Sequence, residues 1–477
     1  MSLLARHAEP IAAVATAGGR GAVGIVRASG RDLRGLMLGL CGRELQPRHA
    51  TLLEFPDASG AVIDTGLALW FPAPHSYTGE DVLELQVHGG PALLQLLLGR
   101  VLEVGRPFGL RVAGPGEFTE RAFHNGKLDL AQAEAVADLI DATTGAAVLG
   151  AQRALAGEMS REVHALAQDL RELRALVEAT LDFPEEDIEF VRAHAVGRRV
   201  RELMQALRGL LARTRQGALL REGLHVVLAG QPNVGKSSLL NALAGAELAI
   251  VTEVAGTTRD RLRESIQIEG VPLHVIDTAG LRDTEDRVES IGVARSWEAI
   301  AQADAVLFVH DLQRLEQAHY RAEEARIAAR LREHGVPDAR LLHVWNKSDS
   351  LPAPDADAAL RAFAGELGLG GAACAGPRLS ARHGQGLQEL RRQLLLRCGW
   401  EAMPEGVFLA RTRHVQALRA CEEHLERASA WLDQASPALE LLAEELRLGH
   451  AELMGITGEV SADELLGDIF SRFCIGK

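Results

Sequence analysis

Apolar and polar positions follow two different patterns along the chain. In residues 1–125 and 221–398, short apolar runs rich in β-branched residues are separated by glycines and polar turns, a pattern typical of buried strands. In residues 126–220 and 399–477, apolar residues recur every three or four positions, which predicts helices. The sequence therefore predicts a multidomain α/β protein in which one sheet-containing domain is inserted into an α-helical bundle domain.

The first 125 residues are predicted to form a small α+β unit. Ile11–Ala15 and Val23–Val26 are apolar runs on either side of a glycine-rich turn, which indicates a β-hairpin. The turn also has Gly-x-Gly-x-x-Gly spacing from Gly19, but a strand follows it where a dinucleotide fingerprint needs a helix, so we reject that site. Further strands are predicted at Gly66–Phe71 and Val82–Val87, and a helix at Leu93–Val104.

The two helical segments have the same Ala/Leu/Glu/Arg-rich texture. The first continues to Gln216, with a break near Asp182–Pro184. The second begins after Trp400 and is predicted to contain three helical stretches, Val407–Leu432, Ala438–Leu446 and Ala451–Phe473. We expect the inserted domain to occupy residues 221–398. Residues 351–378 are rich in Ala, Gly and Pro and are not assigned.

Composition narrows the function classes. The formal net charge of −14 excludes a uniformly basic nucleic-acid coat, so any RNA contact must use local patches. Five cysteines lie far apart with no Cys-x-x-Cys pair, which argues against a disulfide framework or a zinc site. Because we find no signal-peptide pattern and no apolar run of membrane-spanning length, we expect a cytoplasmic protein without a membrane anchor.

A phosphate-binding loop is predicted between the apolar run His225–Ala229 and the helix that begins at Lys236. Gly230–Ser237 fits Gly-x-x-x-x-Gly-Lys-Ser without a mismatch. The two glycines let successive backbone N–H groups point at one anion, and the helix N-terminus adds its dipole. Lys236 can reach the β- and γ-phosphates, and the Ser237 hydroxyl can bind Mg²⁺.

Three further motifs follow in the order that guanine-nucleotide-binding domains have. Asp277–Gly280 follows the apolar run Leu273–Ile276, where an aspartate can contact Mg²⁺ and Gly280 can donate to the γ-phosphate. Asn346–Asp349 follows Leu341–Trp345, and the Asp349 carboxylate can accept two hydrogen bonds from guanine. Ser380 and Ala381 fit the remaining base-contact loop, and Thr258 in Gly256–Asp260 fits a switch threonine on Mg²⁺. Together the motifs predict a P-loop, Ras-like GTPase domain.

Two features depart from common GTPase patterns. Leu281 stands where Ras-like proteins have a water-orienting glutamine, so the catalytic polar group must lie elsewhere. The strand-like run Phe308–Leu312 ends in Asp-Leu instead of Asp-Gly, and we expect it to touch no motif. The polar candidates that follow Leu281 are Arg282, Asp283, Glu285, Asp286 and Glu289.

The chain resembles the MnmE (TrmE) family of tRNA modification GTPases over nearly its full length. Besides the GTPase block, the resemblance rests on GRGAVGIVRASG (19–30), SYTGEDVLEL (76–85), the segment 114–142, LDFPEEDIEF (181–190) and the end GEVSADELLGDIFSRFCIGK (458–477). It implies a GTP-hydrolysing homodimer that works with the FAD-dependent protein MnmG. Together the two proteins add a carboxymethylaminomethyl or aminomethyl group to C5 of the wobble uridine in certain tRNAs.

The resemblance also implies site residues in the first and last parts of the chain. An N-terminal domain that also mediates dimerisation would bind a one-carbon tetrahydrofolate, such as the 5-formyl or methylene form. Arg27, Glu84 and Lys127 match the family's folate positions, and the terminal Lys477 matches a fourth. Cys474 matches a cysteine near that site whose role is open.

In the GTPase domain the resemblance implies a K⁺ ion beside the nucleotide. Its ligands would be Asn233 and the loop residues Thr252, Val254 and Thr257, while Glu289 would orient the attacking water. Motifs and resemblance together predict these GTP-binding residues: Asn233, Gly235, Lys236, Ser237, Ser238, Thr252, Thr257, Thr258, Asp277, Gly280, Asn346, Lys347, Asp349, Ser380 and Ala381. A different class of function stays open, namely a GTP switch that assembles ribosomes or other complexes without chemistry of its own.

Overall fold

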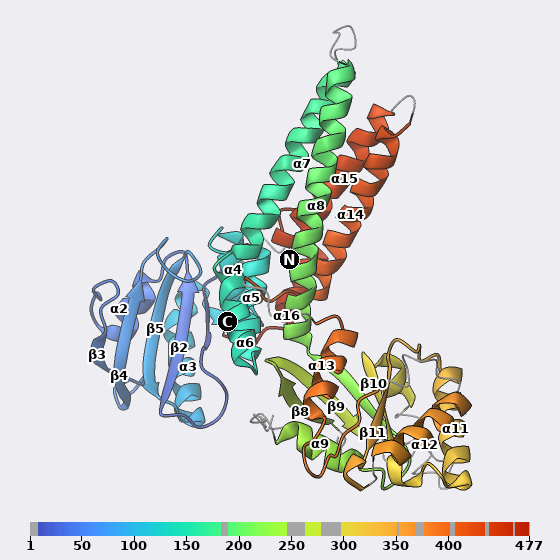
Figure 1. Ribbon diagram of the computed structural model, residues 1–477. Helices are drawn as coiled ribbons and strands as arrows, with labels where there is room; N and C mark the ends of the chain where they lie inside the picture. The colour runs from blue at the N-terminus through green and yellow to red at the C-terminus, as the bar shows by residue number, and fades with distance from the viewer. Residues whose placement is uncertain are drawn as a thin grey trace. The chain divides into compact units, whose positions relative to one another are not determined.

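The computed structural model describes residues 8–182, 189–245, 263–277, 297–350, 353–367, 376–400, 406–434, 438–460 and 463–476. It divides the chain into two compact units (Figure 1). The first contains Met1–Ala137, Ala154–Ala206 and Ala417–Lys477, and the second contains Asp138–Arg153 and Leu207–Gln416. The predicted division at residues 125, 220 and 398 stays a prediction. No helix within the described residues is both long and apolar enough to cross a membrane.

The first unit begins with a six-stranded sheet of order β3-β4-β5-β2-β1-β6. The predicted hairpin is confirmed, since β1 and β2 pair antiparallel with Ile11 opposite Ser29. The strands are β1 (Ile11–Val14), β2 (Val23–Gly30), β3 (Thr51–Pro56), β4 (Val62–Phe71), β5 (Asp81–His88) and β6 (Arg111–Val112).

The two faces of this sheet pack against different helices. Ala12, Val26 and Ala28 share one core with helices α2 (Arg34–Cys41) and α3 (Pro91–Gly105). Because side chains alternate along a strand, Arg27 and Ser29 lie on the opposite face, as do Ile11 and Ala13. That face packs through Ile11 and Ala13 against Phe118 of α4 (Glu117–His124).

Apart from the helices that pack on the sheet, the described helices of the first unit form two groups. The long helices α7 (Glu158–Asp182) and α15 (Leu439–Thr457) pack against each other (Figure 1). The parts of α8 (Glu189–Glu222) and α14 (Thr412–Leu432) in this unit join them through Arg199–Glu172 and His424–Glu445. The second group is a small apolar cluster in which Leu130 of α5 (Leu130–Asp141) meets Phe470 of α16 (Asp463–Ser471).

The helical segmentation predicted after Trp400 is partly wrong. Residues 439–457 form one helix, so no boundary lies between Leu446 and Ala451. This helix ends where Gly458 adopts a left-handed conformation with φ 86°, a glycine C-cap that apolar periodicity does not reveal. Residues Val407–Ala410 are buried but not helical. Helix α14 therefore starts at Thr412, five residues later than predicted.

The second unit is built on a five-stranded sheet of order β11-β10-β7-β9-β8. Among the described strands of this sheet, only β8 runs antiparallel to its neighbour, and β7 lies between β9 and β10. The chain therefore turns from one side of β7 to the other, the topological switch point at which open α/β sheets bind ligands. The strands are β7 (Leu224–Ala229), β8 (Arg263–Ile268), β9 (Val271–Asp277), β10 (Ala305–Asp311) and β11 (Leu341–Asn346).

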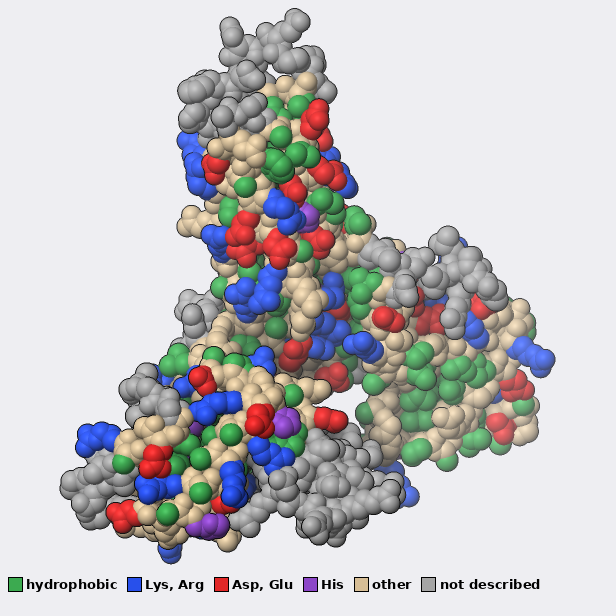
Figure 2. Space-filling view, turned by 90° about the vertical axis from the view of Figure 1, so that its right-hand side faces the viewer, with side chains coloured by type: hydrophobic (Ala, Val, Ile, Leu, Met, Phe, Trp, Pro, Cys, Tyr) green, Lys and Arg blue, Asp and Glu red, His purple; other side chains and the backbone are tan. Residues whose placement is uncertain are grey.

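Helices flank this sheet and close its core. They are α9 (Lys236–Ala244), α11 (Ala318–Glu333), α12 (Ala353–Glu366) and α13 (Leu387–Arg397), with α12 inside the segment left unassigned from sequence. Ala147 and Ala151 of α6 (Gly145–Leu155) pack into the same core. The observed folds match the predicted multidomain α/β class. On the face shown in Figure 2, acidic and basic side chains of the described residues lie intermixed.

Candidate functional site

The phosphate loop lies at the carboxyl end of β7, and its backbone curls through three residues with positive φ. These are Gly230 (φ 140°), Asn233 (φ 65°) and Gly235 (φ 100°). A Cβ atom on Gly230 would lie 2.5 Å from the Val309 carbonyl oxygen, and one on Gly235 would lie 2.3 Å from Asn346 Nδ2. Both positions therefore require glycine for space as well as for conformation.

Lys236 and Ser237 lie in the first turn of α9, directly after Gly235. Lys236 Nζ donates to the carbonyl oxygens of Gly230 at 2.9 Å and Gln231 at 3.1 Å, so the ammonium lies against the loop. The first turn of a helix presents backbone N–H groups and the positive end of the dipole. Loop, lysine and helix end thus bring together several groups that attract an anion.

Asn346 connects three loops that are far apart in the sequence. Its side chain is buried, with Nδ2 donating to the Val234 carbonyl oxygen at 2.8 Å. Its Oδ1 accepts from the Ala381 backbone N–H at 3.1 Å. The predicted base-binding residues Asn346, Ser380 and Ala381 are therefore brought together beside the phosphate loop.

Asp349 lies in the same group of loops. Hydrogen bonding to the Ser380 side chain is the largest cause that lowers the pKa of its carboxyl. The Ser350 hydroxyl is 3.3 Å away, and His383 Nε2 lies at 3.7 Å. An ionised carboxylate in this position is an acceptor only, which suits the two adjacent donors of a guanine base.

The run Phe308–Leu312 contacts a nucleotide-binding motif, contrary to the expectation from the sequence. Lys347 Nζ lies 2.6 Å from Asp311 Oδ2, at the end of β10, and donates to the Asn233 carbonyl oxygen at 2.9 Å. The expectation was wrong because Asp311 stands opposite Asn346 in the β10–β11 register. Asp311 directly follows an apolar run, so the strand-end argument used for the other motifs could have found it.

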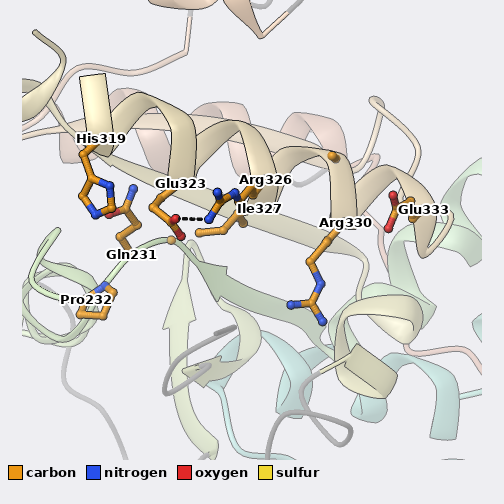
Figure 3. Close-up of a pocket in the computed structure, with 10 residues that line it drawn as sticks. Gln231, Pro232, His319, Glu323, Arg326, Ile327, Arg330 and Glu333 are labelled. Carbon is orange, nitrogen blue, oxygen red and sulfur yellow. Dashed lines mark hydrogen bonds and ion pairs between the residues drawn. The ribbon is translucent and has the colours of Figure 1, made fainter. Parts of the chain in front are cut away.

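A cavity of about 520 Å³ lies between the phosphate loop and α11 (Figure 3). Gln231, Pro232 and His319 line one end, and Glu333 lies at the other. Arg326 and Glu323 form an ion pair on its wall, with 2.5 Å between Nη1 and Oε1. The lining charges have both signs, and Arg326 and Glu323 pair with each other, so the cavity wall does not select one ligand class.

A second candidate site lies on the α4-facing side of the N-terminal sheet. Arg27 and Glu84 are direct partners in the β2–β5 register, and Arg27 Nε and Nη2 each lie 2.8 Å from Glu84 Oε1. The guanidinium carbon lies 5.6 Å from the Tyr77 ring centroid and 5.7 Å from that of Phe118. Arg27 and Glu84 side chains keep 21% and 13% exposure, so the pair is within reach of a ligand.

Lys127 contacts the segment that leads to Tyr77, and Cys474 contacts the segment that leads into α4. Lys127 Nζ donates to the Pro74 carbonyl oxygen at 3.2 Å, in the loop that leads to Tyr77. The Cys474 carbonyl oxygen accepts from the Gly116 N–H at 3.4 Å, and Ile475 bridges to Pro115 at the start of α4. The Cys474 residue is exposed.

A buried charge network, which the sequence did not predict, supports this second site. Arg121 is 1% exposed and donates from Nη1 to Glu80 Oε2 at 3.0 Å and from Nη2 to Glu117 Oε1 at 2.9 Å. Ser29, next but one to Arg27, donates to Glu80 at 2.9 Å. Burial alone would raise the pKa of Glu117, but hydrogen bonds, above all from Arg111, lower it to about 2.

Comparison with known proteins decides the family. A family model described as the MnmE helical domain matches residues 130–474, and one described as the GTP-binding protein TrmE N-terminus matches residues 10–127. The tRNA modification GTPase MnmE of Paracidovorax citrulli is 60% identical over 489 residues, covering 100% of both chains. That of Methylibium petroleiphilum is 62% identical over 489 residues, again with 100% of both chains covered. The chain belongs to the MnmE family of tRNA modification GTPases.

The two MnmE family models cover both candidate sites, Arg27 and Glu84 in one and the nucleotide loops in the other. Among solved structures, the FeoB G-domain from Methanococcus jannaschii is 24% identical with a TM-score of 0.27. It covers 37% of this chain and 97% of that chain.

Asp277 is the last residue of β9, where its backbone pairs with Leu228 of the strand that leads to the phosphate loop. Several other residues that the motifs or the MnmE resemblance single out lie outside the described residues. Those outside the described residues are Thr252, Val254, Thr257, Thr258, Gly280, Glu289 and Lys477, together with Leu281 and the charged residues that follow it.

Proposed function

We propose that this chain hydrolyses GTP to support the modification of the wobble uridine in certain tRNAs. Working as a cytoplasmic homodimer with an FAD-dependent partner of the MnmG type, it adds a carboxymethylaminomethyl or aminomethyl group to C5 of that base. The observation that carries the proposal is the roughly 60% identity to MnmE proteins over the whole chain, which spans both candidate sites.

GTP would bind across the loops at the carboxyl edge of the second sheet. Lys236 and the first turn of α9 would hold the phosphates, and Asp349 would select guanine. Ser237 and Thr258 would hold Mg²⁺, which neutralises charge that develops on the phosphates. The phosphate loop Gly230–Ser237 contains one lysine and no arginine, so a further cation would help to stabilise the transition-state charge.

Asn233 would supply a ligand for K⁺, together with Thr252, Val254 and Thr257. A monovalent cation at the nucleotide supplies the positive charge that an arginine finger supplies in other GTPases. Asn233 is an exposed residue of the loop with an amide oxygen to offer, and Lys347 Nζ holds its backbone carbonyl oxygen at 2.9 Å, which fixes the backbone at this position. Glu289 would orient the attacking water in place of the glutamine that Leu281 replaces.

The N-terminal site would bind the one-carbon tetrahydrofolate that supplies the carbon unit of the added group. Arg27, Glu84, Lys127 and Lys477 would hold it. A partly exposed guanidinium and carboxylate beside two aromatic rings offer donors, acceptors and flat apolar surface, which suit a pterin ring. Cys474 belongs to the same part of the unit, and its role stays open.

The direct test is GTP hydrolysis in KCl and in NaCl at equal ionic strength. We expect K⁺ to raise kcat, and Asn233→Ala to remove most of that acceleration, because one ligand of the charge-stabilising cation is lost. Asn241→Ala is the matched control, because Asn241 is an exposed asparagine in the helix that follows the loop. Equal rates in both salts would contradict the cation-assisted mechanism and favour the GTP-switch alternative.

A further inference from the structure

Four polar contacts in the second unit form a closed path that begins and ends in the phosphate loop. Gln231 Nε2 donates to the Tyr320 carbonyl oxygen at 2.9 Å, and the Tyr320 hydroxyl accepts from the Asp311 N–H at 2.8 Å. Asp311 Oδ2 lies 2.6 Å from Lys347 Nζ, which donates to the Asn233 carbonyl oxygen at 2.9 Å. The path thus joins two loop residues through α11, β10 and the base-binding loop.

Three residues of this path are buried. Gln231, Tyr320 and Asp311 are 3%, 0% and 1% exposed. A buried carboxylate needs charged or hydrogen-bonded partners, because burial removes its water. Both Asp311 oxygens are engaged: Oδ1 accepts from the Gln313 N–H at 3.0 Å, and Oδ2 contacts Lys347.

Asp311 is also held in place by the sheet. It is the last residue of β10, where it pairs in register with Asn346 of β11. Strand β10 also pairs with β7, with Phe308 opposite Ala229. The Asp311 carboxylate therefore has a fixed position relative to both loops, whereas Lys347 has a long flexible side chain. A fixed buried anion next to a flexible cation determines where the ammonium rests.

The position of that ammonium matters for the phosphate loop. Asn233 has φ 65°, a conformation that non-glycine residues seldom adopt, and Lys347 itself has φ 65°. Lys347 holds the Asn233 carbonyl oxygen while Asn346 holds that of Val234, the next residue. Two neighbouring carbonyls of the loop are thus drawn toward the base-binding loop, which leaves the curl of the backbone set before a phosphate arrives.

We propose that Asp311 is a positioning residue for the guanine nucleotide: it holds Lys347 against the Asn233 carbonyl and so presets the phosphate loop. Tyr320 and Gln231 complete the path on the α11 side. This inference rests on the nucleotide site of the proposed function. It adds a residue that acts through Lys347 and that lies outside the GTPase motifs.

The test is a double-mutant cycle between Asp311→Asn and Lys347→Met, read as GDP affinity with a fluorescent GDP analogue. Asparagine keeps the shape of the side chain and its capping ability, and removes the charge. We expect Asp311→Asn alone to weaken GDP binding about tenfold and to raise KM for GTP similarly, with kcat changed less than twofold. In the Lys347→Met protein, the same change should weaken binding less than about twofold.

A loss of similar size in both backgrounds would overturn the proposal, because Asp311 would then not act through Lys347. Asp338→Asn is the control, since Asp338 is exposed in the same unit. Tyr320→Phe removes only the hydroxyl that Asp311 N–H contacts, and we expect a smaller loss of GDP affinity, two- to threefold, together with a lower thermal midpoint because a buried donor loses its partner. If Asp311→Asn fails to fold, Tyr320→Phe serves as the test in its place. Unchanged GDP affinity in Tyr320→Phe would then contradict the proposal. If the unaltered protein binds no guanine nucleotide, the proposed function fails first and this inference fails with it.

Discussion

The nucleotide loops and the Arg27 site are built in different ways. In the second unit, Gly230, Asn233, Gly235 and Lys236 lie within one short stretch, and the first turn of α9 presents backbone N–H groups to an anion. At the Arg27 site, functional groups are side chains from segments that are distant in sequence. Arg27 meets Glu84 only because β2 pairs with β5, and it meets Phe118 only because α4 covers that face.

This difference explains why the phosphate loop can be recognised from residue types and spacing alone, whereas the Arg27 site is identified only through the family resemblance of segments 19–30 and 76–85. A backbone cradle needs glycine at fixed intervals, so the physical requirement leaves a short sequence signature. A site of paired side chains needs only suitable residues at positions that the sheet brings together. Its cost is the burial of charge, which the Glu80–Arg121–Glu117 network offsets by pairing.

The largest effect is expected where that pairing is broken. Arg121→Met should leave Glu80 and Glu117 buried with less compensation and lower the free energy of unfolding by about 3–5 kcal/mol. The control Arg34→Met removes a partner of an exposed pair and should change it by less than about 0.5 kcal/mol. Equilibrium urea unfolding measures both, and equal values for the two variants would contradict a stabilising role for the network.

The next effect tests the backbone cradle. Gly235→Ala should weaken GDP binding more than about 100-fold, because the new Cβ would lie 2.3 Å from Asn346 Nδ2 and the residue has φ 100°. Gly335→Ala is the matched control: Gly335 also has a positive φ, 74°, but a Cβ there meets no atom within 4 Å. Titration with a fluorescent GDP analogue compares them. If both variants bound GDP equally, close packing at Gly235 would not be what the loop requires.

The smallest effect concerns the side-chain site. Arg27→Ala should weaken binding of 5-formyl-tetrahydrofolate about tenfold, the scale of one charge-assisted contact. Arg43→Ala serves as control, because Arg43 is exposed in the same sheet-containing part of the unit. Equilibrium dialysis measures the affinity. A protein that binds no tetrahydrofolate even without substitution would instead favour the GTP-switch alternative.

Several elements could be predicted from local pattern alone. The β1–β2 hairpin, the strand before the phosphate loop and the helix starting at Lys236 all follow from short-range periodicity and turn residues. The end of α15 at Gly458 could not, since a glycine within an apolar periodic stretch does not by itself mark a boundary. The strand-end position of Asp311 could be predicted from the apolar run before it, but its contact with Lys347 depends on which strand lies beside β10.

The sequence by itself determined the class of nucleotide, the phosphate loop and the family, because these depend on residues at fixed short spacing. Only the tertiary structure decided that Asp311 faces Lys347, that Arg27 lies between Tyr77 and Phe118, and that Arg121 is buried between two glutamates. Apart from Arg121–Glu117, which lies within one helix, these contacts join residues tens of positions apart. Strand order, register and helix packing bring such residues together, and none of the three can be read from spacing along the chain.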